Sequence, residues 1–300
     1  MKKLPKLIVI QGPTASGKTK LAIELAKKLE TVIISADSRQ FYTEISIGTA
    51  KPTLEEMQGI PHFFIDSHQL TDEVSAARFA AEAQELIHAD LMDFEYVIVV
   101  GGSGLFIHAF CEGLDEIPHD QNLRNELTES WQKNGLELFL AELKLKDLAF
   151  YEQVDKENPH RVIRAIEAMR ISGKTMTELR KGQSESIFDE VHYFTIEVSR
   201  EKLYQRINER VDVMVSLGLE QEARNVYPLK HLKSLQTVGY NEFFDYFDGK
   251  ITFDKTIELI KQHSRNYAKR QITWFKSHHP GISLIGDLET NLKTILSNSK

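Results

Sequence analysis

Short runs of Val, Ile and Leu recur along the chain and are bounded by turn-forming residues. Runs of this length and composition predict strands that are buried on both faces of a sheet. They lie at residues 7–11, 32–35, 96–102 and 193–198. Between them, residues 21–29 and 76–87 carry apolar side chains at helical spacing. Strands that alternate with helices predict a parallel sheet, with ligands at the carboxyl ends of its strands.

The segment 114–191 lacks the strand pattern and is periodic only in the way of helices. Because it falls between two predicted core strands, it is most simply an inserted subdomain. The sequence therefore predicts an α/β fold, a P-loop NTPase-like parallel sheet with an inserted all-helical subdomain. Residues 1–113 and 192–300 would form the catalytic core.

The pattern beyond the last predicted strand is again mainly helical. It indicates a helix at 201–217 that ends at Gly218, a turn at 237–243 and a long helix at 254–276. The last dozen residues are predicted to be a frayed tail.

Composition and charge narrow the class of protein. With 300 residues, of which 41% are hydrophobic and 27% charged, the chain is typical of globular proteins. Its net charge of −7 means that nucleic acid would have to be bound by local basic patches. Cys111 is the only cysteine, which excludes an internal disulfide and a zinc site of several thiolates. Since no apolar run reaches about 18 residues and no leader-like start is visible, we expect a cytoplasmic protein without a membrane span.

The stretch IVIQGPTASGKT, from Ile8 to Thr19, fits the phosphate-loop pattern G-x-x-x-x-G-K-[ST]. It follows a predicted strand and opens a predicted helix, which is the context that the motif requires. Lys18 offers a charge to terminal phosphates, and Thr19 offers a hydroxyl to Mg²⁺. A purely structural glycine turn is the alternative. The motif predicts a diphosphate site made by Gly12, Pro13, Thr14, Ala15, Ser16, Gly17, Lys18 and Thr19.

Two further elements follow predicted strands. The strand near residue 100 ends in GGSG, where phosphoryl-transfer enzymes usually carry an Asp for Mg²⁺. Small residues there let a ligand approach, with Ser103 as a donor, although a plain tight turn is the alternative. Asp37 follows the second strand, on the same rim as the phosphate loop. It can take a proton or bind a metal, or it can cap a following helix, and the residues leave these possibilities open.

Two stretches concentrate positive charge. Residues 156–181 hold seven Lys or Arg against three Glu, and Arg161 and Arg164 share a helix face. Residues 261–279 hold five Lys or Arg and no acidic residue, interleaved with aromatic side chains. Either stretch alone is commonly a solvated helix face. Together with a diphosphate site on an acidic protein, they favour a bound polyanion.

Eight motifs, in order from about residue 7 to 276, resemble those of the tRNA dimethylallyltransferases, also called tRNA isopentenyltransferases. They are GPTASGKT, SADSRQFY, IGTAKP, GGSGLFIHAF, RVIRAIE, RINERVDVM, TVGYNEF and YAKRQITWF. The chain is similar to the short, bacterial type of that family. It departs from the usual family pattern at Phe106, where Tyr is common, and at Asn241, where a basic residue is common.

The resemblance implies transfer of a dimethylallyl group from dimethylallyl diphosphate to N6 of the adenosine on the 3′ side of the tRNA anticodon, with release of pyrophosphate. By similarity, Asp37 is the general base, Thr19 binds Mg²⁺ and assists the leaving group, and Arg210 stabilises charge on pyrophosphate. The insertion resembles the anticodon-arm domain of the family. The tRNA-contacting positions so implied are Asp37, Ser38, Arg39, Gln40, Ser103, Arg124, Arg161, Val162, Ile163, Arg164 and Ala165.

Other functions share part of this pattern. A kinase of a small metabolite or nucleoside has the same loop and sheet, but it gives no reason for two basic stretches. A non-catalytic, nucleotide-gated RNA-binding protein is a second alternative, in which Asp37 is dispensable. Arg161, Arg164 and Arg210 can also form surface ion pairs with neighbouring glutamates. We expect a monomer, because no heptad seam is visible.

Overall fold

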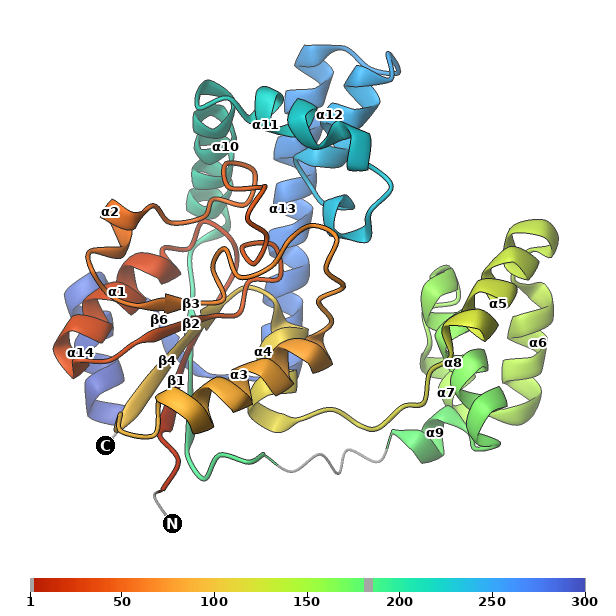
Figure 1. Cartoon of the computed structure of the whole chain (residues 1–300), viewed down its shortest axis with the longest axis horizontal. Helices are drawn as coiled ribbons and strands as arrows, with labels where there is room; N and C mark the ends of the chain where they lie inside the picture. Colours follow the sequence, from red (N-terminus) through yellow and green to blue (C-terminus); the bar gives the residue numbers. More distant parts are fainter. Residues whose placement is uncertain (1–2, 181–185, 300) are drawn as a thin grey trace. The chain divides into compact units, whose positions relative to one another are not determined.

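The computed structural model describes residues 3–180 and 186–299 and divides into two compact units (Figure 1). The first unit comprises Met1–Cys111 and Ile187–Lys300, and the second comprises Glu112–Ser186. The second unit therefore lies within the sequence of the first, at boundaries slightly different from the expected 114–191. The second unit ends earlier than expected, because the Phe188 side chain is buried in the core of the first unit.

A six-stranded sheet organises the first unit, and all of its paired strands run parallel. Its spatial order is β3 (His62–Phe63), β2 (Ile33–Ser35), β4 (Tyr96–Gly101), β1 (Lys6–Gln11), β5 (Val191–Ile196) and β6 (Ile282–Leu284). The four predicted strands and the parallel α/β fold are confirmed. The edge strands β3 and β6 were not predicted, since two or three residues are too few for a periodic signal.

Helices cover both faces of this sheet (Figure 1). Alternate strand residues point to opposite faces, so Val97 and Val99 lie in one apolar cluster while Ile98 and Val100 lie in the other. The first cluster includes side chains of α3 (Ala76–Asp90), α4 (Gly104–Glu112) and the end of α13 (Phe253–His278). The second cluster includes side chains of α1 (Lys18–Leu29) and α14 (Leu288–Asn298). Burial on both faces explains why the strands are almost wholly apolar.

A third apolar cluster joins the remaining helices of this unit to the loops after β2. Its helical members are α10 (Arg200–Ser216), α11 (Leu219–Val226), α12 (Tyr240–Phe247) and α13. Three short helices complete the unit: α2 (Leu54–Met57) and the 3-10 turns η1 (Tyr227–Leu229) and η2 (Lys233–Leu235).

Two expectations for the C-terminal part are wrong. The last residues form α14 rather than a frayed tail, because Leu292 and Ile295 are buried beneath the sheet. The segment 237–243 is only partly a turn, since α12 begins at Tyr240. Glu242 caps the N-terminus of that helix, because its carboxylate accepts the Gly239 amide at 2.7 Å.

The second unit is a small helical bundle. Its helices are α5 (Gln121–Asn134), α6 (Glu137–Lys146), α7 (Leu148–Gln153), α8 (Pro159–Ser172) and α9 (Met176–Leu179). Helix α8 starts at an Asn158 cap with Pro159 in its first turn and ends at Gly173, as helix signals predict. The described part of this unit contains no strand, as the sequence indicated.

Within residues 3–180 and 186–299, no helix is both long and apolar enough to cross a bilayer.

Candidate active site

The phosphate loop joins β1 to α1 at the carboxyl edge of the sheet. Ala15 and Gly17 have left-handed backbone conformations, with φ of 61° and 97°. Left-handed residues placed in this way turn successive N–H groups toward a common anion, which is the geometry of an anion nest. Lys18 begins α1, whose dipole adds positive potential at the same point.

Two cations border this loop. Burial lowers the pKa of Lys18 to about 8, with Asp37 opposing that shift and Arg210 reinforcing it. Burial also lowers the pKa of Arg210, which still keeps its charge near neutrality. The Arg210 guanidinium extends from α10 to within 3.5 Å of the Thr14 hydroxyl. Two partly desolvated cations beside an anion nest make the phosphate loop well suited to bind a diphosphate.

Asp37 lies in a tight turn directly after β2. Its carboxylate accepts the Arg39 amide at 3.1 Å, and its carbonyl accepts the Gln40 amide at 3.1 Å. In the described chain no helix begins between β2 and Leu54. The helix-capping alternative for Asp37 is therefore excluded.

The GGSG turn after β4 lies against the Asp37 turn. The Ser103 hydroxyl accepts the Ser38 amide at 3.0 Å and donates to the Ser38 hydroxyl at 3.1 Å. A Cβ on Gly101 would lie 2.3 Å from the Ala36 carbonyl oxygen, so only glycine allows the two turns to approach this closely. Ser103 is thus a support of the Asp37 turn.

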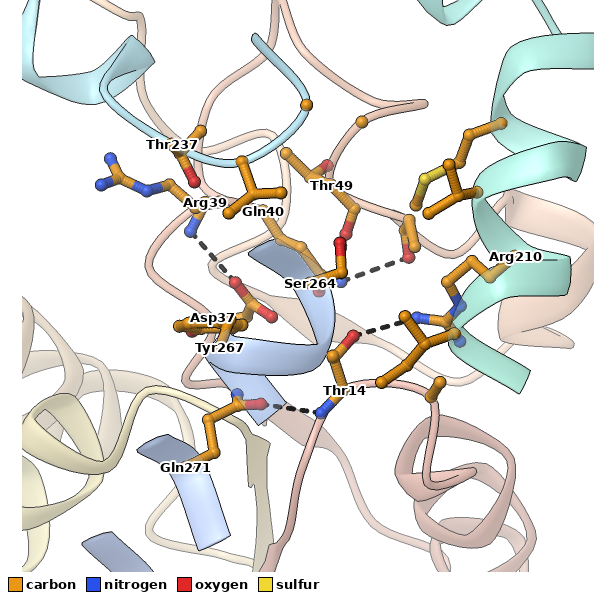
Figure 2. Close-up of a pocket in the computed structure, with 18 of the residues that line it drawn as sticks. Thr14, Asp37, Arg39, Gln40, Thr49, Arg210, Thr237, Ser264, Tyr267 and Gln271 are labelled. Atoms are coloured by element: carbon orange, nitrogen blue, oxygen red, sulfur yellow. Dashed lines mark hydrogen bonds between the residues drawn. The ribbon is translucent and has the colours of Figure 1, made fainter. Parts of the chain in front are cut away.

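Gln271 of α13 bonds to both glycine-rich turns, and Figure 2 shows its bond to Thr14. Its Oε1 accepts the Thr14 amide of the phosphate loop at 2.8 Å, and its Nε2 donates to the Gly102 carbonyl at 2.9 Å. These fixed partners settle the orientation of the side-chain amide. A Cβ on Gly102 would lie 2.2 Å from Nε2, so a larger residue there would displace the Gln271 amide. One buried side chain therefore links the two turns, which the pairing of β1 with β4 already brings close together.

The electrostatic environment makes Asp37 a candidate base. Burial raises the pKa of Asp37 above its ordinary value, against the Arg39 amide and the charges of Lys18, Arg39 and Arg210. Burial and the nearby Asp37 charge also raise the pKa of Tyr267 to about 12, so this phenol stays a hydrogen-bond donor. A desolvated carboxylate surrounded by cations is typical of a group that accepts a proton.

One cavity of about 980 Å³ in the first unit unites these features. Its lining includes the phosphate loop, the Asp37 turn, Arg210 and the Tyr267 side of α13, as Figure 2 shows. Apolar side chains such as Val211, Met214 and Leu219 line another part of its wall. The cavity offers an anion site, a base and an apolar surface in a volume that suits a substrate of moderate size.

Arg124 and Arg164, predicted to contact tRNA, share a buried partner in the second unit. The Glu167 carboxylate accepts from Arg124 at 2.8 and 2.9 Å and from Arg164 at 3.1 Å, and it is fully buried. Ion pairing, which the sequence left open for Arg164, is therefore present. Two arginines against one carboxylate still leave a net positive charge.

Arg161 differs from these two arginines because it is exposed on α8 and forms no ion pair with any described residue. Val162, Ile163 and Ala165, which the resemblance places around the tRNA, have side chains buried in the bundle core, so the exposed charge at these positions of α8 comes from Arg161. Their regular spacing on α8 is a packing pattern. Of the charged residues in this basic stretch, Lys181 lies outside the described residues.

The second basic stretch is partly neutralised. Lys261 pairs with Asp212 at 2.6 Å, and Arg265 donates to Asn208 at 2.7 Å. Arg270 lies over the Tyr267 ring at 5.8 Å and lines the cavity. This stretch therefore ties α13 to α10 as well as presenting charge.

Sequence reasoning missed the roles of Tyr267 and Gln271 in the site. Both belong to the motif YAKRQITWF, and their i, i+4 spacing places them on one face of α13 together with Ser264. That polar face on an otherwise amphipathic helix was the available signal.

A family model described as IPP transferase matches residues 40–278 of the chain, which is most of its length. The chain belongs to the IPP transferase family. The Bacteroides thetaiotaomicron protein named tRNA dimethylallyltransferase 1 is 44% identical over 274 residues, which cover 91% of this chain and 89% of that protein. The Pediococcus pentosaceus tRNA dimethylallyltransferase is 44% identical over 279 residues, covering 91% and 89%.

Solved structures of this family share the fold. The tRNA isopentenylpyrophosphate transferase of Bacillus halodurans is 36% identical, with a TM-score of 0.71 over 97% of this chain and 94% of that one. A eukaryotic dimethylallyltransferase described as acting on tRNA is 27% identical, with a TM-score of 0.81 over 95% of this chain and 75% of that one.

Proposed function

We propose that this protein is a tRNA dimethylallyltransferase. It transfers the dimethylallyl group of dimethylallyl diphosphate to N6 of the adenosine 3′-adjacent to the anticodon and releases pyrophosphate. The observation that carries the proposal is the single cavity in which the phosphate loop, Arg210 and Asp37 all take part. The names of the family relatives support the same activity.

The leaving group is stabilised by the phosphate loop. As the bond between C1 of the allyl group and the diphosphate oxygen breaks, negative charge grows on pyrophosphate. The loop N–H groups, Lys18 and Arg210 bind that charge in a desolvated place, where each contact is stronger than in water. The Thr19 hydroxyl, which lines the same cavity, completes the set.

Asp37 accepts the proton that the adenine amine loses. The N6 nitrogen forms its bond to C1 while its N–H proton passes to the Asp37 carboxylate, which is held still by the Arg39 amide. Ser103, in the turn after β4, supports this turn through its bonds to Ser38, and Tyr267 of α13 lines the same cavity. The raised pKa of Asp37 makes it a better base than an exposed aspartate.

Magnesium fits this site through the substrate rather than through a protein cage. Among the described residues no cluster of three or more His, Cys, Asp or Glu could hold a metal. Mg²⁺ commonly binds substrate phosphates with few protein ligands, and we propose the hydroxyl of Thr19, a residue that lines the cavity, as one of them. When bound, the ion neutralises charge on pyrophosphate.

The anticodon arm of tRNA is the proposed partner of the helical unit. Arg161 offers an exposed charge, and the Arg124, Arg164 and Glu167 group offers a net positive one. Bases in RNA loops are unstacked at modest cost, roughly a few kcal/mol, which allows the adenine to enter the cavity.

The test is a transfer assay with Mg²⁺, dimethylallyl diphosphate and unmodified tRNA, followed by mass analysis of the nucleosides. We expect one dimethylallyl group on the adenosine next to the anticodon, with ATP unable to replace the donor. Transfer of phosphate from ATP to a small molecule, without prenylation, would instead support the kinase. The glycine at position 101, where kinases usually carry a metal-binding Asp, argues against that outcome.

A further inference from the structure

Glu222 of α11 lies outside the reaction centre, yet its carboxylate makes four hydrogen bonds. It accepts the amides of Ser46 and Ile47 at 2.8 Å each and the amide of Gly48 at 2.9 Å. It also accepts the Tyr240 hydroxyl of α12 at 2.6 Å. Three successive backbone N–H groups that converge on one anion form a nest, here filled by a side chain of the protein itself.

The loop that Glu222 holds is part of the cavity wall. Gly48, whose amide Glu222 binds, lines the cavity together with Thr49 and Ala50, which follow it directly. A Cβ on Gly48 would lie 2.6 Å from the Tyr240 hydroxyl oxygen, so the loop is pressed closely against α12. Burial and the Glu222 carboxylate raise the pKa of Tyr240, which keeps this phenol a donor at working pH.

The same loop is connected to the Asp37 turn through Gln40. The Gln40 Nε2 donates to the carbonyls of Thr49 and Ala50 at 3.3 Å each, and its Oε1 accepts the Ser35 hydroxyl at 3.2 Å. Gln40 also closes the Asp37 turn through its backbone amide. The four hydrogen bonds of Glu222 lead to this side of the cavity, and none of the four leads to the phosphate loop.

We propose that Glu222 is a positioning residue for the acceptor side of the reaction. It fixes the Ser46–Gly48 backbone, which fixes the carbonyls that orient Gln40 and the Asp37 turn. The adenine therefore meets its base in the productive geometry, while diphosphate binding is independent of Glu222. This inference rests on the proposed transferase function and deepens it.

The experiment compares Glu222→Ala, Glu222→Gln and Tyr240→Phe with a matched control. For Glu222→Ala we expect kcat/KM for tRNA to fall roughly ten- to a hundredfold, because misplacement of reacting groups costs this much. Pyrophosphate affinity, measured by calorimetry, should stay within about twofold of the wild-type value, because pyrophosphate is bound by the phosphate loop and not by the loop that Glu222 holds. Glu220→Ala, on the same helix and paired with Arg224 at 2.9 Å, should leave both quantities unchanged.

The conservative variants separate positioning from general stability. In Glu222→Gln the new amide oxygen can still accept the Ser46 and Ile47 amides, but the new NH₂ group would face the Gly48 amide. This variant should therefore lie between wild type and Glu222→Ala. Tyr240→Phe removes one bond of four and should have the smallest effect. Hydrogen exchange should become faster at residues 46–50 in Glu222→Gln and stay unchanged in the phosphate loop.

The outcomes distinguish this inference from the function on which it rests. If the wild type transfers no dimethylallyl group, the proposed function fails. If the wild type is active but Glu222→Gln keeps normal kcat and KM for tRNA, the positioning role is overturned. An equal loss of pyrophosphate affinity and transfer would also overturn it, as a purely structural role. Should Glu222→Ala not fold, Glu222→Gln and Tyr240→Phe decide between these results.

Discussion

At the scale of single residues, the site depends on a few side chains with shifted protonation. Asp37 and Lys18 are pushed toward their neutral forms by burial, and each partly stabilises the charge of the other. The protonation of both groups therefore responds to the substrates, because a bound diphosphate favours charged Lys18 and an incoming amine needs charged Asp37. Both consequences can be measured.

Replacing Asp37 with Asn keeps the shape of the turn and removes the base. We expect kcat to fall roughly 10²- to 10⁴-fold while the tRNA dissociation constant changes only a few fold. In the wild type, activity should be present above the raised pKa of Asp37 and lost as pH falls through it, since the base must be ionised. A steady-state pH profile tests this, and an Asn variant with normal turnover would eliminate Asp37 as the base.

The lowered pKa of Lys18 predicts a pH dependence of diphosphate binding. The ammonium is charged below about 8 and neutral above it, so pyrophosphate affinity should decline as pH rises from about 7 to about 9.5. The decline approaches tenfold for each pH unit at the upper end if one proton is linked to binding. Calorimetry at each pH measures it, with Lys18→Ala as a weak binder whose affinity lacks this dependence. A flat wild-type curve would contradict the prediction.

At the scale of elements, the site is built from helices and from the loops that follow three neighbouring strands. Helix α13 supplies Gln271 and Tyr267, α10 supplies Arg210, and α11 supplies Glu222. The loops after β1, β2 and β4 bring the phosphate loop, Asp37 and Ser103 to the same edge of the sheet. Adjacent parallel strands explain this meeting, because β2, β4 and β1 are neighbours.

Substitutions in helix α14 can show whether the C-terminal segment is part of the core. Ile295 is fully buried in the cluster that α1 shares with the sheet. Ile295→Ala should therefore lower the free energy of unfolding by about 2–4 kcal/mol in urea denaturation. Lys293→Ala, which removes an exposed pair with Glu289, should change it by less than about 0.5 kcal/mol. Equal, small effects of both changes would return this segment to the frayed tail that its sequence suggested.

At the scale of the whole molecule, an acidic chain must bind a polyanion through local charge. The net charge of −7 repels RNA at long range, so each exposed cation that contacts a phosphate contributes to RNA affinity. Arg161 is such a cation, whereas Arg124 and Arg164 are engaged by Glu167. The basic stretch is therefore less uniform than its composition implied.

Arg161→Ala should weaken tRNA binding and reduce the salt dependence of its affinity by about one phosphate contact. Arg170→Ala is the matched control, because it removes the same charge from the opposite face of α8, nine residues away, where Arg170 pairs with Glu142 at 2.6 Å. Binding measured at several salt concentrations compares the slopes. Identical slopes for wild type and Arg161→Ala would rule out this contact.

The sequence by itself determined the parallel sheet, the phosphate loop, the helical insertion and the candidacy of Asp37. These follow from local pattern, since strand burial, loop turns and helix caps depend on neighbouring residues. The family motifs also carried the proposed reaction. What such patterns cannot report is which side chain meets which across the fold.

Only the tertiary structure decided the partners. It placed Gln271 between two turns that are far from it in sequence. It also paired Glu167 with two arginines, and it showed that Glu222 accepts hydrogen bonds from the loop that follows the Asp37 turn. It also showed that the side chains of Val162, Ile163 and Ala165 belong to the core of the helical unit. The physical reason is that hydrogen bonding and burial of a side chain depend on long-range packing, which brings together residues that no local spacing connects.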